Sequence, residues 1–184
     1  MDALTIRAAT DADWPAIVQV LWAAFGDAGD GEIVDLVADL LADPTARPLW
    51  SLVVADNGRV AGHILFTAAR IEPEPEGVTT AILAPMAVHP DCQNRGIGRR
   101  LIDHGLARLK ADGVGLVLVL GDPGYYTRFG FAPAGAQGLE APHPIPPEHA
   151  DAWMVQALEP GLVGRVRGRV VCADSLMDPT HWRI

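Results

Sequence analysis

The sequence predicts an α/β fold in which helices flank a mixed, mostly antiparallel central sheet with one parallel pair of strands. Three observations support this prediction. An Asn-Gly turn joins two apolar, β-branched runs, which is typical of an antiparallel hairpin. A run of helical periodicity separates two further apolar runs, which is typical of a parallel βαβ unit. The chain has 184 residues, 49% of them hydrophobic, which is enough for one packed core.

The first third of the chain predicts one strand followed by two helices. A short strand is expected over Leu4–Ala8. Thr10 and Asp13 have the spacing of a helix cap, and apolar residues then recur at helical intervals as far as Phe25. A second amphipathic helix is expected over Glu32–Leu41, after a flexible acidic connection.

The middle of the chain predicts a hairpin and a further strand. Apolar runs at Trp50–Ala55 and Val60–Ala68 are joined by Asp56–Arg59, which contains the Asn-Gly pair. Another strand is expected over Thr79–Val88. Pro85 lies inside it, and because proline has no backbone N–H group, it predicts an edge, a bulge or a local splay there.

The next segment completes the predicted crossover unit. Helical periodicity runs over Gly98–Ala111, and a buried-type strand follows at Gly115–Leu120. The last third is expected to hold a short segment at Pro123–Phe129 and two strands at Trp153–Leu158 and Val163–Ala173. The sheet is therefore expected to be mixed.

Charge and composition narrow the classes of function. The chain has 23 acidic and 14 basic residues and a net charge of −9, so we expect no nucleic-acid partner. The sequence has no apolar run long enough for a membrane span and no leader pattern at its start. Its two cysteines form no metal pair or disulfide framework, so we expect a cytoplasmic protein without membrane or metal binding. Without repeats, residues 1–184 are expected to form a single domain.

One segment between a predicted strand and a predicted helix carries the clearest sign of ligand binding. Within Gln93–Arg100, Gly96 and Gly98 let backbone amides approach an anion closely. The helix start adds unpaired N–H donors and the positive end of its dipole, and three nearby arginines strengthen the preference. The alternative is that the glycines only shape a turn. A Rossmann fingerprint would need a third glycine, and a Walker A loop would need Gly-Lys-Ser/Thr.

Three motifs in a characteristic order resemble those of the GNAT acyltransferases, in particular the bacterial YhbS-like branch. They are Leu83–Pro90, Gln93-x-x-Gly96-x-Gly98 and Gly121–Phe131. The resemblance extends over most of the chain. It implies one GNAT-type acyltransferase domain with acetyl-CoA bound between two splayed parallel strands.

The resemblance also implies which residues bind acetyl-CoA. A bulge in the first splayed strand frees backbone groups of Met86, Ala87 and Val88 for the pantetheine arm and the thioester carbonyl. A backbone donor there would stabilise the tetrahedral intermediate. The pyrophosphate is expected on the glycine segment. Its residues are Gln93, Asn94, Arg95, Gly96, Ile97, Gly98 and, as a further contact, Arg99.

A tyrosine is the expected general acid. In that family, the tyrosine that protonates the departing CoA thiolate lies five residues before the phenylalanine of the Gly-Phe motif, which here is Tyr126. Tyr125 is expected to pack or to face the substrate, and an offset of one residue would exchange the two roles. The alternative is that both tyrosines only pack.

Acylation of an amine also requires a base, and the sequence does not single one out. Glu32 is the first candidate, because it begins the second helix, near where family members build the acceptor site. His63, His89 and Asp122 are further candidates. Each of these four residues has a structural alternative as a first-turn charge, a strand residue, a turn residue or a strand-end cap.

Other residues are weaker candidates. Trp22 or Phe25 could line an acceptor pocket, and Asp27 and Asp30 could attract a cationic amine, with a solvated acidic loop as the alternative. Cys92 lies near a helix start and suggests a covalent nucleophile, but direct transfer needs no cysteine.

These observations predict an acetyl-CoA-dependent N-acetyltransferase. Its acceptor, a small-molecule amine or a protein amino group, would attack the thioester directly in a ternary complex. A non-catalytic acyl-CoA-binding or sensing domain is the alternative, and an ATP-binding protein that uses the glycine segment is a third. No residue pattern determines the oligomeric state, so a homodimer through the late strands stays open.

Overall fold

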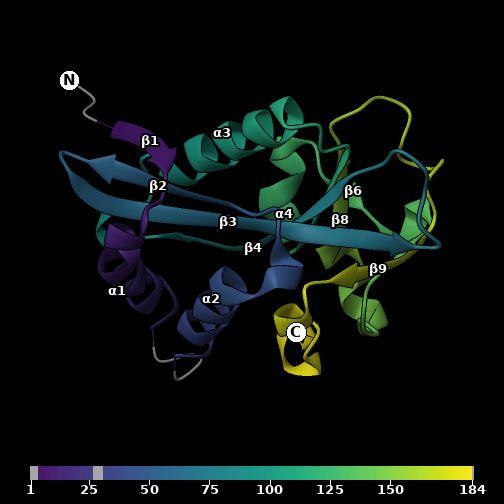
Figure 1. Cartoon of the computed structure of the whole chain (residues 1–184), viewed down its shortest axis with the longest axis horizontal. Coiled ribbons are helices and arrows are strands. Elements are labelled where there is room, and N and C mark those ends of the chain that lie inside the picture. The colour runs from purple at the N-terminus through teal and green to yellow at the C-terminus, as the bar shows by residue number, and fades with distance from the viewer. Residues whose placement is uncertain (1–3, 27–30, 184) are drawn as a thin grey trace.

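The structure is a computed structural model that describes residues 4–26 and 31–183. Within these residues one nine-stranded sheet runs in the order β1-β2-β3-β4-β5-β8-β6, and β9 pairs with both β3 and β7 (Figure 1). The strands are β1 (Leu4–Ala8), β2 (Trp50–Asp56), β3 (Arg59–Glu72), β4 (Thr80–Val88), β5 (Leu116–Leu120), β6 (Ala132–Pro133), β7 (Leu139–Glu140), β8 (Trp153–Ala157) and β9 (Gly168–Cys172). The α-helices are α1 (Trp14–Phe25), α2 (Glu32–Ala42), α3 (Ile97–Ala111) and α4 (Pro123–Tyr126). The fold class predicted from the sequence is confirmed.

The hairpin between β2 and β3 forms as predicted. Asn57 and Gly58 both adopt positive φ, at 50° and 82°, which is the backbone that a tight two-residue hairpin turn requires. The second strand is longer than predicted, because β3 runs on to Glu72. Its extension pairs with β9, so this strand connects the first half of the chain to the last third.

The strand that contains Pro85 has both a bulge and a splay. Ile64 of β3 pairs with Met86, but Phe66, two residues further along, pairs with Leu83, so β4 carries an extra residue at this point. The parallel pairing of β4 with β5 stops at Leu83. Beyond Leu83, the edge of β4 that faces β5 is therefore free of ladder bonds, as the proline predicts.

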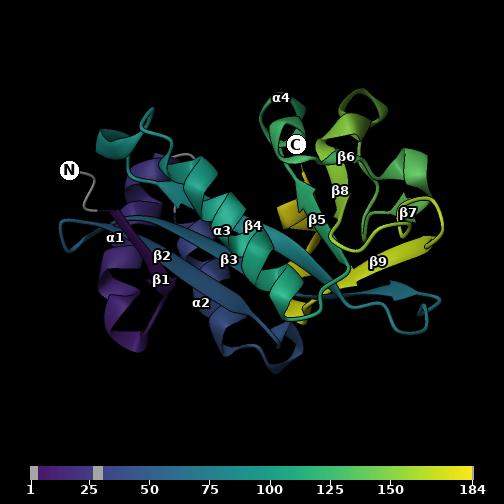
Figure 2. The ribbon, with the colours of Figure 1, turned by 90° about the horizontal axis from the view of Figure 1, so that it is seen from above.

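Helices cover both faces of the sheet (Figure 2). Buried residues of α1 and α2 pack on one face, in a cluster that includes Leu21, Val37 and Leu65. Buried residues of α3 pack on the opposite face, in a cluster that includes Leu101 and Phe66. The alternation of side chains along β3 supplies both clusters, which makes this strand the centre of the core.

The last third departs from the prediction. The strand expected over Val163–Ala173 is wrong in its first half, because β9 begins only at Gly168. Gly164 and Gly168 adopt positive φ, at 85° and 145°, and this backbone interrupts an extended strand. After β9 the chain forms 3₁₀ turns at Asp174–Leu176 and Pro179–Trp182, and the first of them packs against α2.

None of the helices in the described part of the chain is long and apolar enough to cross a membrane.

Candidate functional site

Two adjoining cavities lie where β4 and β5 diverge, one of about 530 Å³ and one of about 400 Å³. Phe25 and Met86 line both, so the cavities meet at the end of α1 and at the bulge of β4. Tyr125 lines the first cavity and Tyr126 lines the second. The geometry therefore provides two binding spaces that share one boundary.

The first cavity is built around the start of α3. Gly96 precedes the helix with φ of 73°, and the backbone N–H of Arg100 donates to its carbonyl as the first helical bond. The N–H groups of Ile97, Gly98 and Arg99 precede that bond and have no carbonyl within the helix to donate to. Because the positive end of the helix dipole lies at the same place, this wall favours an anion.

Gly98 brings the helix backbone close to Tyr125. A Cβ at Gly98 would lie 2.7 Å from the Tyr125 hydroxyl oxygen and 3.4 Å from the methyl carbon of Met86. Any side chain at this position would therefore enter the cavity. The glycine matters here because it keeps this space open and not because of its φ.

The arginines of the glycine segment divide between binding and structure. Arg99 lines the first cavity and is largely exposed. Arg95 pairs with Asp56 at 2.8 Å, so its guanidinium fastens the segment to the β2–β3 turn. Arg128, which the sequence reasoning missed, also lines the cavity, with its guanidinium carbon 5.5 Å from the centre of the Tyr125 ring. In the sequence, Arg128 could have been identified from its position in the third motif, one helical turn after Gly124.

The remaining residues expected to bind the cofactor lie in the same place. Those that line the first cavity are Met86, Ala87, Val88, Gln93, Asn94, Gly96, Ile97, Gly98 and Arg99. The Gln93 side-chain amide donates to the carbonyl of Val88 at 3.3 Å, which holds the segment against the end of β4. Cys92 lines this cavity too, although it is buried.

The second cavity contains Tyr126 and the bulged edge of β4. The Tyr126 ring packs against Gly121 and contacts Phe131 edge to face, with the ring centres 5.8 Å apart. Burial raises the pKa of Tyr126 to about 12, so its hydroxyl keeps its proton at neutral pH. The same cavity is lined by Ala84 and Pro85. A proton donor therefore lies in the same cavity as the bulged, unpaired edge of β4.

The four candidate bases are not equivalent. Glu32 is exposed and lines the second cavity. His89 accepts a bond from the Asp91 backbone N–H at 3.1 Å and serves the turn that it begins. Asp122 accepts from the Gly124 N–H at 2.9 Å and caps α4. Neither of these two lines a cavity described above.

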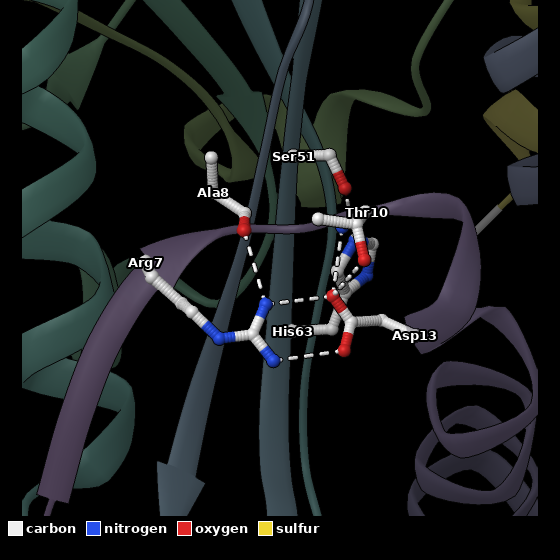
Figure 3. Close-up of polar contacts among 6 residues, drawn as sticks. All are labelled: Arg7, Ala8, Thr10, Asp13, Ser51 and His63. Carbon is white, nitrogen blue, oxygen red and sulfur yellow. Dashed lines mark hydrogen bonds and ion pairs between the residues drawn. The ribbon is translucent and has the colours of Figure 1, made fainter.

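His63 belongs to a buried polar cluster on the sheet. Its Nε2 lies 2.8 Å from the Ser51 hydroxyl, next to the ion pair of Arg7 and Asp13 (Figure 3). Burial lowers the pKa of His63 to about 4, an effect that the nearby Asp13 carboxylate only partly opposes. A neutral, fully buried imidazole outside both cavities is a structural residue.

The residues near the α1–α2 connection are only partly described. Phe25 lines both cavities, whereas Trp22 packs against Gly31 and lines neither of them. Asp27 and Asp30 lie outside the described residues. Among the residues that are described, no three His, Cys, Asp or Glu side chains are grouped so that they could hold a metal ion.

One wall of the second cavity was missed by the sequence reasoning. It comes from the segment after β9 and consists of Leu176, Thr180, His181, Trp182 and Arg183. Trp182 anchors this wall, because it is buried, donates to the Leu176 carbonyl at 2.8 Å and contacts the Trp153 ring edge to face. The segment has no periodic pattern, so only the three-dimensional structure brings it to the site.

Comparisons with known proteins agree with this architecture. The model of the acetyltransferase (GNAT) domain family matches residues 5–134. Over 147 residues the chain is 45% identical to the uncharacterized N-acetyltransferase YjhQ of Escherichia coli strain K12, with 79% of this chain and 81% of the relative covered. Over 141 residues it is 30% identical to the uncharacterized N-acetyltransferase YhbS of the same strain, with 77% and 81% covered.

Two solved structures are similar over nearly the whole chain. The crystal structure of YhbS from Escherichia coli in complex with CoA has a TM-score of 0.84 and 29% sequence identity, with 97% of this chain and 94% of that chain covered. A GNAT family acetyltransferase from Brucella melitensis in complex with acetyl-CoA has a TM-score of 0.74 and 30% identity, with 96% and 99% covered.

Proposed function

The chain belongs to the GNAT family of acetyltransferases, and from this premise we propose that it transfers an acetyl group from acetyl-CoA to a primary amine by direct attack. The observation that carries the proposal is the pair of cavities that meet at Met86. One has the features of a cofactor site and the other contains a proton donor. Direct transfer requires this arrangement, because both substrates must reach the same carbonyl carbon.

The residues of the first cavity fit the CoA part of the cosubstrate. Unpaired amides at the start of α3, together with Arg99 and Arg128, suit a pyrophosphate. The free edge of β4 at Met86–Val88 offers backbone groups to the pantetheine arm, which would extend toward the second cavity. Arg95 would contribute through its backbone, because its side chain pairs with Asp56.

Acetyl-CoA would supply the activated thioester carbonyl that the amine attacks. Backbone N–H groups of β4 would donate to the carbonyl oxygen as negative charge develops on it. Tyr126 would give its hydroxyl proton to the sulfur as the carbon–sulfur bond breaks. Its raised pKa suits this role, since the hydroxyl is protonated before the reaction. Glu32 would attract the acceptor ammonium at the far wall.

The extent of the domain, the acceptor and the cellular location are also part of the proposal. We propose one acyltransferase domain over residues 1–184, because residues 176–183 line the acceptor side although the family model ends at 134. The acceptor would be a small-molecule amine or a protein amino group. A cytoplasmic location is part of the proposal, since the two cysteines are unpaired, as is typical of a reducing compartment.

Calorimetry with acetyl-CoA tests the cofactor site. We expect saturable binding by the wild-type protein and weaker or no binding of ATP. In Gly98→Leu the new side chain would fill the space beside Tyr125, so acetyl-CoA affinity should fall at least tenfold. Gly135→Leu is the matched control, because a Cβ at Gly135 meets no atom within 4 Å and lies away from the first cavity.

Two outcomes would contradict the proposed site. If the folded wild-type protein did not bind acetyl-CoA, the acyltransferase proposal would fail. If Gly98→Leu bound as tightly as Gly135→Leu, the cofactor would lie elsewhere. Binding followed by release of CoA in the presence of an amine would distinguish an enzyme from a non-catalytic acyl-CoA-binding domain.

A further inference from the structure

The wall contributed by residues 176–183 brings a histidine to the second cavity, the proposed acceptor site. His181 lies in the 3₁₀ turn Pro179–Trp182 and is partly buried. It lines the same cavity as Tyr126 and Glu32. Of these three side chains, only the imidazole is of a type that ordinarily changes charge between pH 5 and 8.

The turn that carries His181 is held in place at several points. The Asp178 carboxylate accepts bonds from the Thr180 N–H at 2.9 Å and the Thr180 hydroxyl at 2.8 Å. The backbone N–H of His181 donates to the Asp178 carbonyl at 3.1 Å. On the other side of His181, Trp182 is buried in the core. Such a turn presents the imidazole from a fixed backbone, as a proton-transferring group requires.

The charged and titratable groups near His181 come from three elements. Asp178 and Arg183 lie on its own segment. The pKa of Asp178 is lowered mainly by its hydrogen bonds from Thr180, and His181 and Arg183 lower it further. Glu32 begins α2 and Tyr126 ends α4, and both line the cavity with His181. The Glu32 carboxylate favours a cation in this space. Carboxylates in general are too acidic to remove a proton from an alkylammonium ion efficiently at neutral pH, whereas an imidazole is better matched.

We propose that His181 is the general base of the acceptor site and that the acceptor is a primary monoamine with an apolar body. This inference rests on the acyltransferase function proposed above. The apolar body is inferred from the walls of the cavity, which are mostly apolar and include Phe25, Ile33, Leu36, Leu83, Leu176 and Trp182. The Arg183 guanidinium, exposed at this wall, disfavours an acceptor with further positive charges.

The proton balance of the transfer is complete with these groups. His181 takes one proton from the ammonium, and the nitrogen lone pair then forms the bond to the carbonyl carbon. The carbon–sulfur bond breaks, the electron pair stays on sulfur, and Tyr126 supplies the proton of the CoA thiol. The second proton lost from the nitrogen restores the Tyr126 hydroxyl, and His181 releases its proton to solvent. The products are the amide, CoA and one proton.

Steady-state kinetics with phenethylamine as the probe test the inference. CoA release is followed between pH 5.5 and 8.5 at saturating acetyl-CoA, with spermidine as the polycationic comparison. We expect kcat/KM at least tenfold higher for phenethylamine than for spermidine. At saturating phenethylamine, the wild-type kcat should fall as the pH is lowered, because a general base that has taken up a proton cannot accept another from the amine.

His181→Gln should lower kcat about 100-fold or more at pH 7.5 and remove this acid limb, and added imidazole should restore part of the rate. His104→Gln is the matched control, since His104 is exposed on α3 and away from both cavities. Calorimetry should give the same acetyl-CoA affinity for wild type and His181→Gln, which also shows that the variant is folded.

The outcomes separate the two proposals. Failure of wild type to bind acetyl-CoA would overturn the acyltransferase function itself. Acetyl-CoA binding without turnover of phenethylamine would overturn the acceptor class. Turnover with a wild-type rate and acid limb in His181→Gln would remove His181 from the reaction. If His181→Gln did not fold, a wild-type kcat independent of pH between 5.5 and 7.5 would still overturn the assignment.

Discussion

Two adjacent tyrosines line different cavities because α4 turns their rings apart. The Tyr125 and Tyr126 rings stand nearly perpendicular, at 86°, with centres 5.1 Å apart. Tyr125 lines the first cavity near Gly98, and Tyr126 lines the second near the bulge of β4. Neighbours in the sequence can therefore be tested separately.

Tyr126→Phe should lower kcat by about 100-fold to 10,000-fold, because it removes the proposed proton donor and keeps the ring that packs on Gly121. The acetyl-CoA affinity should stay within about twofold of wild type. Stopped or continuous measurement of CoA release, combined with calorimetry, checks both expectations. Tyr125→Phe is the control and should keep most of the turnover. The reverse pattern would assign the acid role to Tyr125.

His63 shows how a buried imidazole can be structural although its sequence position attracts a catalytic interpretation. Its side chain is fully buried, bonded to Ser51 through Nε2 and without a partner at Nδ1. The Arg7–Asp13 pair beside it closes the cluster with bonds of 2.7 and 2.9 Å. The cluster joins β1, β2 and β3 to the start of α1. The charge states of its residues therefore affect the free energy of unfolding.

The stability of the protein should therefore fall as the pH drops from about 6.5 to about 4. The pKa of His63 is near 4 in the folded protein and 6.5 in the ordinary case, so in this window only the unfolded chain takes up the proton. Over this whole window the free energy of unfolding should fall by about 3 kcal/mol. Urea unfolding at several pH values measures it. The slope of the free energy of unfolding against pH gives the number of protons taken up on unfolding. His63→Gln should reduce this number by close to one, whereas His104→Gln should not. An unchanged slope in His63→Gln would refute this expectation.

Between elements, one carboxylate connects the end of α2 to the turn after β9. Asp43 accepts bonds from the Thr45 N–H and hydroxyl at 2.8 and 2.6 Å. It also accepts from the Ser175 N–H and hydroxyl at 3.0 and 2.8 Å. These bonds hold the pKa of Asp43 well below its usual range. The segment that forms one wall of the second cavity is thus fastened to the end of α2, which is far from it in the sequence.

Asp43→Ala should lower the free energy of unfolding by roughly 2–4 kcal/mol, because four donors lose their acceptor and two of them are backbone groups. The acetyl-CoA affinity should not change, but the KM for phenethylamine should rise, since the wall with His181 is no longer fixed to α2. Chemical denaturation and steady-state kinetics measure these effects. Asp43→Asn keeps one acceptor oxygen and should lose less stability. Equal stability of Asp43→Ala and wild type would contradict this role.

At the level of the whole molecule, the parts of the fold that follow from local rules were predictable. The Asn57-Gly58 hairpin, the crossover unit around α3 and the bulge at Pro85 each depend on the backbone preferences of a few neighbouring residues. The first cavity was predictable for the same reason, because glycines at a helix start act locally. Arg128 lies in the third motif, so it could have been predicted with the other residues expected to bind the cofactor.

The second cavity was not predictable, because it forms only when distant segments pack together. Glu32 was a candidate from its place at the start of a helix, but nothing near His181 in the sequence indicates that α2 and β4 will face it. The first half of the expected strand Val163–Ala173 failed for a related reason. Val163 and Val166 favour a strand, but Gly164 and Gly168 adopt positive φ and turn the backbone between them and β9.

The division of the site into two cavities bears on how such enzymes diversify. The first cavity, the proposed cofactor site, is lined only by residues within 5–134, the part of the chain that the family model matches. One wall of the second cavity, the proposed acceptor site, comes from residues 176–183, outside the matched part. Mutations in this wall can therefore change the second cavity without changing the lining of the first. Selection can retain one acetyl donor and give each lineage its own amine.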